Sequence, residues 1–296
     1  MARTVDFDGA FTAIATPFRN GEIDFAALDK LIEHQIAGGI QGVVPVGTTG
    51  ESPTLSASEQ QAVIARTIAT VKQRTFVIAG TGTNSTRETI ERTRAAQEAG
   101  ADAAMIVTPY YNKPTQRGLI DHVRAVHDAT QIPLVLYNVP PRTSVDLLAE
   151  SVVEIAKHCP RVVAVKEATG NVLRTQQIVG ALGDRLAVLS GDDALTLGIL
   201  ACGGRGVISV TSNIAPAAVQ RIVKQFHAGD LAGARATHLG LLALHDSMFV
   251  ETNPGPVKAA LSMMGICAPE VRLPLAWPTE KSLGLVRSAL QSAKLI

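Results

Sequence analysis

The 296-residue sequence is poor in aromatic side chains, which make up 4% of it. It has seven Phe, one Trp and three Tyr, the last being Tyr110, Tyr111 and Tyr137. The core must therefore be built from aliphatic side chains, and hydrophobic residues make up 46% of the chain. A chain of this length buries about three quarters of the surface that its unfolded form exposes, so it needs no disulfide or metal to fold.

Several other features are scarce. The formal net charge is only +1, with no basic run, which argues against nucleic acid as a partner. No apolar stretch approaches the ~20 residues of a membrane-spanning helix. The start, MARTVDFDGAF, lacks the apolar segment of a secretory signal. The three cysteines form no CxxC or Cys/His cluster, which disfavours a zinc site and a disulfide framework. We expect a soluble, cytoplasmic protein with no nucleic-acid or membrane partner.

Short aliphatic runs recur along the first two thirds of the chain, roughly 20–34 residues apart, the spacing of a strand, a helix and two loops. They are apolar throughout, as parallel strands buried on both faces should be. The expected strands are Phe11–Ala15, Gly42–Val46, Phe76–Ala79, Ala103–Val107, Pro133–Tyr137, Val162–Lys166, Leu186–Leu189 and Gly206–Val210.

The segments between these runs have helical periodicity. Leu28, Leu31, Ile32 and Ile36 form one stripe of a helix expected over Phe25–Ala37. Ser-Ala-Ser-Glu at 56–59 and Ser-Thr-Arg-Glu at 85–88 each predict a capping box at the start of a helix. After about residue 225 the strand pattern stops, and helices are expected over Asp230–Met248, Pro256–Met264 and Glu280–Ala293.

Eight strands alternating with helices fit either a closed (β/α)8 TIM barrel or an open doubly wound sheet. The even spacing and the absence of GxGxxG after the first strand favour the barrel. We expect a catalytic barrel over residues 1–225 and a C-terminal helical appendage over residues 226–296.

Active sites of such barrels lie where strands run into the following loops. Polar residues, including all three tyrosines, gather at five of these junctions. The junctions are Gly47–Glu51, Thr108–Asn112, Tyr137–Thr143, Lys166–Gly170 and Ser190–Asp193.

Lys166 is the sharpest candidate, because it ends the apolar strand Val162–Val165. Desolvation would lower its pKa and make its amine a nucleophile. Alternatively, the lysine extends from the barrel rim to solvent or pairs with Glu167. Alternation along the strand puts Lys166 and Glu167 on opposite sides, which weakens the paired interpretation.

Three further junctions offer matching chemistry, each with a structural alternative. The Gly-Thr-Thr-Gly turn around Thr48 and Thr49 suits a carboxylate, or is an ordinary turn. Tyr137 can pass protons, or is a packing aromatic. Arg142 follows two prolines and can clamp a carboxylate, or lies on the surface.

No metal site is expected. The seven histidines form no HxxxH or HExxH set, and we interpret them as structural or solvent-facing. Asp192 and Asp193 have no companion ligand motif, so we interpret them as a helix N-terminus.

Six motifs occur in order: GTTGES at 47–52, TPYYN at 108–112, YNVPPRT at 137–143, VKEATG at 165–170, SGDD at 190–193 and GVISV at 206–210. Together they resemble the dihydrodipicolinate synthase (4-hydroxy-tetrahydrodipicolinate synthase) family of pyruvate-dependent class I aldolases. The resemblance runs from about residue 9 to at least 225. It implies a lyase that condenses pyruvate with L-aspartate 4-semialdehyde to give 4-hydroxy-tetrahydrodipicolinate, the entry step of diaminopimelate and lysine biosynthesis.

The resemblance also implies catalytic roles, carried over by motif. Lys166 would form a Schiff base with pyruvate, and Tyr137 would carry protons at the iminium. Thr48 would relay protons between Tyr137 and Tyr111, which in this family reaches into the neighbouring subunit's site.

The remaining implied roles concern binding. Thr49 would hold the pyruvate carboxylate, Arg142 the semialdehyde carboxylate, and Gly191 would contribute to the substrate site. Ile208 would line the lysine through its backbone carbonyl. The family needs no metal or organic cofactor and is usually a homotetramer, a dimer of dimers.

The resemblance extends to an effector site. Relatives inhibited by lysine bind it at the dimer interface with groups that fall here on Ser52, Asn84, Glu88 and Tyr110. Two positions that carry histidine in some inhibited relatives are Ala57 and Gln60 here. We therefore expect weak or absent inhibition by lysine.

Three alternatives remain open from the sequence. One is a sister aldolase acting on a sugar acid of the N-acetylneuraminate or keto-deoxy-gluconate type; such relatives tend to have Ser-Thr at Thr48–Thr49 and to lack an arginine like Arg142. The others are a non-catalytic binding barrel and a metal-dependent aldolase.

Overall fold

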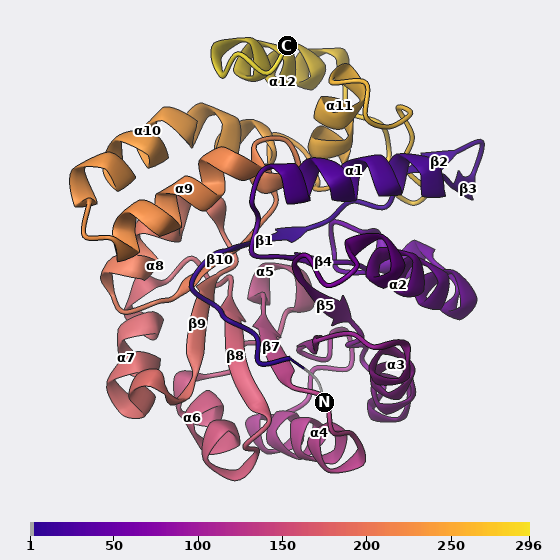
Figure 1. Cartoon of the computed structure of the whole chain (residues 1–296). Helices are drawn as coiled ribbons and strands as arrows, with labels where there is room; N and C mark the ends of the chain where they lie inside the picture. Colours follow the sequence, from indigo (N-terminus) through magenta and orange to yellow (C-terminus); the bar gives the residue numbers. More distant parts are fainter. Residues whose placement is uncertain (1–2) are drawn as a thin grey trace.

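The computed structural model describes residues 3–296, in which eight parallel strands close into a barrel in the order β1-β10-β9-β8-β7-β6-β5-β4 (Figure 1). The strands are β1 (Ala10–Ala13), β4 (Gly42–Val44), β5 (Phe76–Gly80), β6 (Ala103–Val107), β7 (Leu134–Asn138), β8 (Val162–Glu167), β9 (Ala187–Ser190) and β10 (Gly206–Ser209). The predicted TIM barrel is confirmed, and each strand end lies within two residues of its expected place.

Helices surround the barrel (Figure 1). They are α1 (Phe25–Ala37), α2 (Ala57–Val71), α3 (Thr86–Ala99), α4 (Gln116–Ala129), α5 (Pro140–Thr143), α6 (Ala149–His158), α7 (Val172–Leu182), α8 (Thr196–Ala201) and α9 (Pro216–His227). A hairpin of β2 (Phe18–Arg19) and β3 (Glu22–Ile23) precedes α1. Three one-turn 3-10 helices follow strands, namely η1 (Ser52–Thr54), η3 (Asp193–Leu195) and η4 (Thr211–Asn213), and η2 (Gly183–Arg185) follows α7.

The two predicted capping boxes differ in outcome. At α2, Ser56 accepts from the Glu59 backbone N–H, and the Glu59 carboxylate accepts from that of Ser56, so both halves are present. At α3, Ser85 accepts from the Glu88 N–H, but the Ser85 N–H donates to Thr83 instead. The prediction of a second capping box was wrong for the hydrogen bond from the Ser85 N–H to the Glu88 carboxylate, because Glu88 pairs with Arg92 one turn later.

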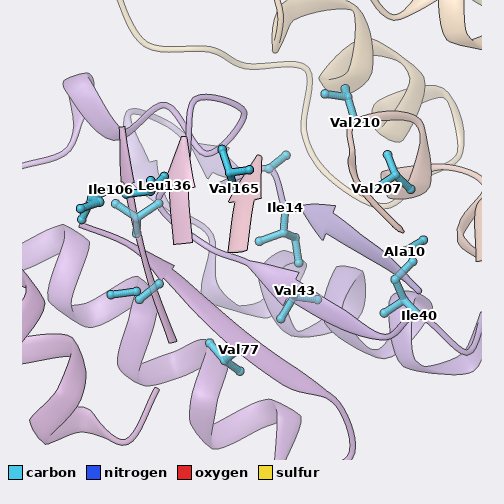
Figure 2. Packing of buried hydrophobic residues seen from close by; sticks show 14 of the residues in the cluster. Ala10, Ile14, Ile40, Val43, Val77, Ile106, Leu136, Val165, Val207 and Val210 are labelled. Atoms are coloured by element: carbon cyan, nitrogen blue, oxygen red, sulfur yellow. The ribbon is translucent and has the colours of Figure 1, made fainter. Parts of the chain in front are cut away.

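The strands divide the core into two layers. One face of each strand fills the barrel with side chains such as Phe11, Val44 and Ile78, while the other packs against the helices. Figure 2 shows part of the outer layer, where Val165 of β8 lies near Leu136 of β7. Apolar packing on both faces explains why the strands lack polar alternation.

The C-terminal region is helical, with α10 (Leu231–Ser247), α11 (Gly255–Met263) and α12 (Glu280–Ser292). Helix α10 packs on α9, and α12 packs on α10 and α11 (Figure 1). Among residues 3–296, no helix is both long enough and apolar enough to cross a bilayer.

Candidate active site

Lys166 and Tyr137 lie side by side because their strands are paired neighbours. In the β7–β8 register Tyr137 is opposite Lys166. The Lys166 Nζ lies 4.3 Å from the centroid of the Tyr137 ring, and both side chains are buried. The structure thus brings together an amine, which can form an imine with a carbonyl carbon, and a phenol, which can transfer the protons of that reaction.

Glu167 does not pair with Lys166. Its carboxylate faces the opposite side of β8, where Arg174 of α7 donates to it at 3.1 Å and Asn138 lies at 3.5 Å. Within residues 3–296, no ion pair involves Lys166. The predicted opposite orientation is confirmed, and the amine remains available for a carbonyl carbon.

Gly191 and Ile208 complete the surroundings of Lys166. A Cβ on Gly191 would lie 2.6 Å from the Ala168 Cβ and 3.2 Å from the Lys166 Cγ, so a side chain there would displace the lysine. Ile208 lies on β10, fully buried in the barrel interior.

The two aspartates after β9 have different roles. Asp192 accepts from the Ala194 N–H at 3.0 Å and caps η3, as predicted. Asp193 is instead buried and accepts from the backbone N–H groups of Val210 and Thr211, at 2.9 and 3.0 Å. Asp193 is the first residue of η3, so both aspartates lie at a helix N-terminus as predicted. The contacts of the Asp193 carboxylate with the end of β10 were not predicted. No group of three or more potential ligands gathers at a metal site in the described chain.

The Thr48–Thr49 turn begins with a strained residue. Val46 has a φ of 58°, a left-handed conformation that a β-branched residue rarely adopts. Pro45, which has no N–H to donate, and Val46 end β4 earlier than expected. The sharp bend leaves Thr48 half-buried and Thr49 buried.

Thr49 is held by a residue that the sequence did not identify. Asn253, just before α11, donates from Nδ2 to the Thr49 Oγ1 at 3.0 Å. This leaves the Thr49 hydroxyl proton free to donate, for example to a carboxylate. The backbone carbonyl of Asn253 also accepts from the exposed Arg142 of α5, at 3.5 Å.

One cavity of about 420 Å³ is lined by residues of both predicted sites. Thr48 and Tyr137 contribute from the predicted catalytic set, and Arg142 from the predicted substrate-binding set. Ser52, Asn84, Glu88 and Tyr110 contribute from the proposed effector set. The residues that line this cavity do not include Lys166, Thr49, Gly191 or Ile208. The Lys166 Nζ lies over the ring of Tyr137, which does line it.

Tyr111 does not join this group. Its side chain is 89% exposed, and its φ of 69° turns the chain sharply after β6. Within one chain, therefore, Tyr111 does not line the cavity with Thr48 and Tyr137.

Two contacts lie at the end of the cavity that the predicted effector residues line. Gln60 donates to the carbonyls of Ser52 and Leu55, at 2.9 and 3.2 Å, so its amide is committed to the backbone. Glu88 pairs with Arg92 at 3.3 Å, and Arg92 lines the same cavity. A ligand cation there would compete with a guanidinium for Glu88.

A buried ion pair joins the Gly47–Glu51 turn to the C-terminal region. Lys258 of α11 donates to Glu51 at 2.6 Å, and neither side chain is exposed. Burial lowers the pKa of Lys258, and the Glu51 carboxylate opposes that shift. Lys258 is the only charged residue of α11, which could have pointed to a buried ion pair, but its partner lies too far away in sequence to be recognised.

Comparison with known proteins adds to the geometry. The model of the "Dihydrodipicolinate synthetase family" matches residues 6–293. A 4-hydroxy-tetrahydrodipicolinate synthase of Sorangium cellulosum is 55% identical, over 96% of this chain and 95% of its own.

Solved structures agree with this similarity. A chloride-inhibited dihydrodipicolinate synthase from Acinetobacter baumannii, complexed with pyruvate, superimposes with a TM-score of 0.96 at 45% identity, over 98% of this chain and 100% of its own. The enzyme of Cyanidioschyzon merolae with lysine bound gives a TM-score of 0.95 at 38% identity, over 98% and 99%.

Proposed function

This chain belongs to the dihydrodipicolinate synthetase family, and we propose that it condenses pyruvate with L-aspartate 4-semialdehyde to give 4-hydroxy-tetrahydrodipicolinate. The observation that carries the proposal is the Lys166 amine, free of any carboxylate partner in residues 3–296 and 4.3 Å from the Tyr137 ring. The relatives described above carry the synthase name, which does not favour a sugar-acid lyase.

The reaction begins with the amine of Lys166. It adds to the keto carbon of pyruvate, and the resulting carbinolamine loses water to form an iminium. Tyr137 exchanges the protons that these steps require. The iminium withdraws electrons from the adjacent methyl group, which loses a proton and becomes an enamine nucleophile.

The enamine carbon then attacks the aldehyde carbon of the semialdehyde, forming the new carbon–carbon bond, and the aldehyde oxygen takes a proton to become the hydroxyl group. The amine of the same substrate next attacks the iminium carbon and displaces Lys166. Ring closure thus frees the enzyme, and one water is released overall.

The other residues bind and relay. Thr48 relays protons between Tyr137 and the exposed Tyr111, which comes from a neighbouring subunit. Thr49 holds the pyruvate carboxylate with its free hydroxyl proton, and Arg142 holds the carboxylate of the semialdehyde. Gly191 leaves room beside Lys166 for the substrate, and the Ile208 carbonyl lines the lysine.

The same proposal includes the protein's setting. The enzyme acts in the cytoplasm as part of diaminopimelate and lysine biosynthesis, and it assembles as a dimer of dimers. Residues 1–225 form its catalytic barrel and residues 226–296 a helical region. Its substrates need no metal or organic cofactor, since the Lys166 iminium supplies the electron sink.

Lysine inhibits this enzyme weakly or not at all. Ser52, Asn84, Glu88 and Tyr110 form its effector site, but Ala57 offers no polar group and Gln60 is engaged with backbone carbonyls. Half-inhibition by lysine below the millimolar range would overturn this part of the proposal.

The principal test is borohydride reduction in the presence of pyruvate. We expect a stable adduct whose mass maps to Lys166, and no adduct without pyruvate. Its absence would remove the Schiff-base mechanism. A panel of aldehydes offered with pyruvate then tests the second substrate, because rapid turnover only with a sugar aldehyde would indicate a sugar-acid lyase instead.

A matched variant separates the two substrates. Arg142→Ala should still form the pyruvate adduct but lose condensation with the semialdehyde. Normal condensation by this variant would refute the carboxylate clamp.

A further inference from the structure

The Gly47–Glu51 turn ends on a carboxylate that does not face the cavity. Glu51 has a φ of 55°, and its side chain is fully buried. The Glu51 N–H donates to the Thr48 carbonyl at 3.1 Å, so its position is tied directly to that of the proposed proton relay.

Both oxygens of Glu51 bind the C-terminal region. Oε1 accepts from Lys258 at 2.6 Å, and Oε2 accepts from the backbone N–H of Arg272 at 2.9 Å. A buried ion pair often stabilises a fold no more than apolar residues of the same volume, whereas its directional contacts fix one arrangement of the groups. Orientation is therefore a better explanation of this pair than stability.

The cation of the pair is itself fixed. The Lys258 Nζ lies 4.1 Å from the centroid of the Phe18 ring, and the Arg272 guanidinium lies 4.4 Å from it. Arg272 also donates to Glu59, at 2.6 and 3.0 Å, and holds the pKa of that carboxyl at about 2. The pair is thus held by contacts with Phe18 of β2 and, through Arg272, with Glu59 of α2.

Lys258 is also connected, through a short series of contacts, to the residues predicted to bind the substrates. Lys258 lies on the first turns of α11, and its N–H donates to the Pro254 carbonyl at 2.9 Å. The preceding residue is Asn253, which contacts Thr49 and Arg142. A shift of α11 relative to the turn would therefore disturb the contacts of Asn253 with Thr49 and with Arg142, which lines the cavity.

We propose that Glu51 and Lys258 are positioning residues for the reaction, because their ion pair holds Thr48 and Thr49 at fixed positions relative to Tyr137 and Lys166. This proposal rests on the proposed function and deepens it. Neither residue contacts the reacting atoms.

The test compares Lys258→Met, Glu51→Gln and the double variant, each in the full-length protein. Thermal midpoints are measured beside the single-turnover rate of borohydride trapping with pyruvate. Lys258→Met leaves Glu51 buried without a cation and should lower both quantities, the trapping rate at least tenfold. In the double variant we expect recovery of the thermal midpoint but a trapping rate still at least fivefold below that of the unaltered chain.

The double variant decides the matter, because a merely structural pair would regain its rate together with its midpoint. That result, or a normal rate in Lys258→Met despite a lower midpoint, would overturn the proposal. Glu51→Gln keeps the shape and an acceptor for Lys258, so it supplies the same comparison if Lys258→Met does not fold; we expect at least a threefold slower rate.

Asp102→Asn is the matched control. Asp102 accepts from Arg3 and from the Val77 N–H at the amino-terminal end of β5, away from the cavity. It should lower the midpoint without changing the trapping rate. Since trapping by the unaltered chain establishes the Schiff base separately, a normal rate in the pair variants would count against the pair alone.

Discussion

The two halves of the candidate site are positioned in different ways. Lys166 and Tyr137 lie on adjacent strands, and the register of β7 and β8 is enough to bring them together. Thr49 lies in a turn and depends on Asn253, 204 residues further along the chain. One half is thus positioned by local pairing, and the other by the C-terminal region, which therefore does more than cover the barrel.

Removing the nucleophile is the largest perturbation of the half formed by Lys166 and Tyr137 on adjacent strands. Lys166→Met should lower condensation by about 10⁴-fold or more and abolish the pyruvate adduct, because no amine remains to form the covalent intermediate. Steady-state rates and the mass of the borohydride-treated protein measure this. Lys157→Met, on the exposed side of α6, is the control and should retain both. Adduct formation in Lys166→Met would place the Schiff base elsewhere.

Removing only the phenol of Tyr137 should have a smaller effect. Tyr137→Phe keeps the ring beside Lys166 but loses the proton carrier, and we expect kcat to fall by about 10²–10⁴-fold. A kcat within threefold of the unaltered chain would show that Tyr137 serves only in packing.

Behind Tyr137 lies a buried histidine that should make stability depend on pH. His122 and Tyr137 line the same small cavity of about 10 Å³, and burial lowers the pKa of His122 from 6.5 to about 4. Between these values the unfolded chain binds a proton that the folded chain does not, so stability falls as the pH falls from 6.5 to about 4, by about 3 kcal/mol.

Urea unfolding of His122→Asn across that pH range checks this effect. The asparagine can still hydrogen-bond to Thr86 and does not titrate, so the variant should lose most of the slope. An unchanged slope would assign the acid sensitivity to other groups.

A change to the half formed by Thr49 and its contact with Asn253 should give the smallest effect. Asn253→Ala removes the donor to Thr49, a loss of roughly 1–2 kcal/mol for a buried hydrogen bond, and should raise the KM for pyruvate about tenfold. Steady-state kinetics with pyruvate varied measures this. If instead kcat falls while the KM is unchanged, the contact acts on the chemical steps rather than on the binding of pyruvate.

The same contrast explains what could be predicted from the sequence. Lys166 and Tyr137 end apolar runs, and a barrel brings all such ends to one face, so periodicity alone was enough to group them. The helices after residue 225 were also predicted by periodicity. Asn253, Lys258 and Arg272 were missed, because no local pattern states which distant loop a side chain will contact.

Smaller omissions have the same cause. Asp193 does lie at the N-terminus of η3 as predicted. The sequence did not indicate that its carboxylate would accept from Ser209, Val210 and Thr211, on the next strand and its loop. Ser85 does begin its helix as predicted, but Glu88 prefers Arg92. In both cases, a carboxylate bonds to a partner that the local sequence motif does not include.

The separation of 207 residues between Glu51 and Lys258 also has a consequence for biosynthesis. A chain emerging amino-terminus first can form its early βα units before the last helices exist. The contact between the turn that carries Thr48 and α11 can form only after α11 has been made, and contacts so distant in sequence form slowly. If Lys166 is the nucleophile and the Glu51–Lys258 pair aligns Thr48 and Thr49, as proposed, a chain that has completed Lys166 carries the amine before the residues that align its partners, and it becomes competent only near the end of synthesis.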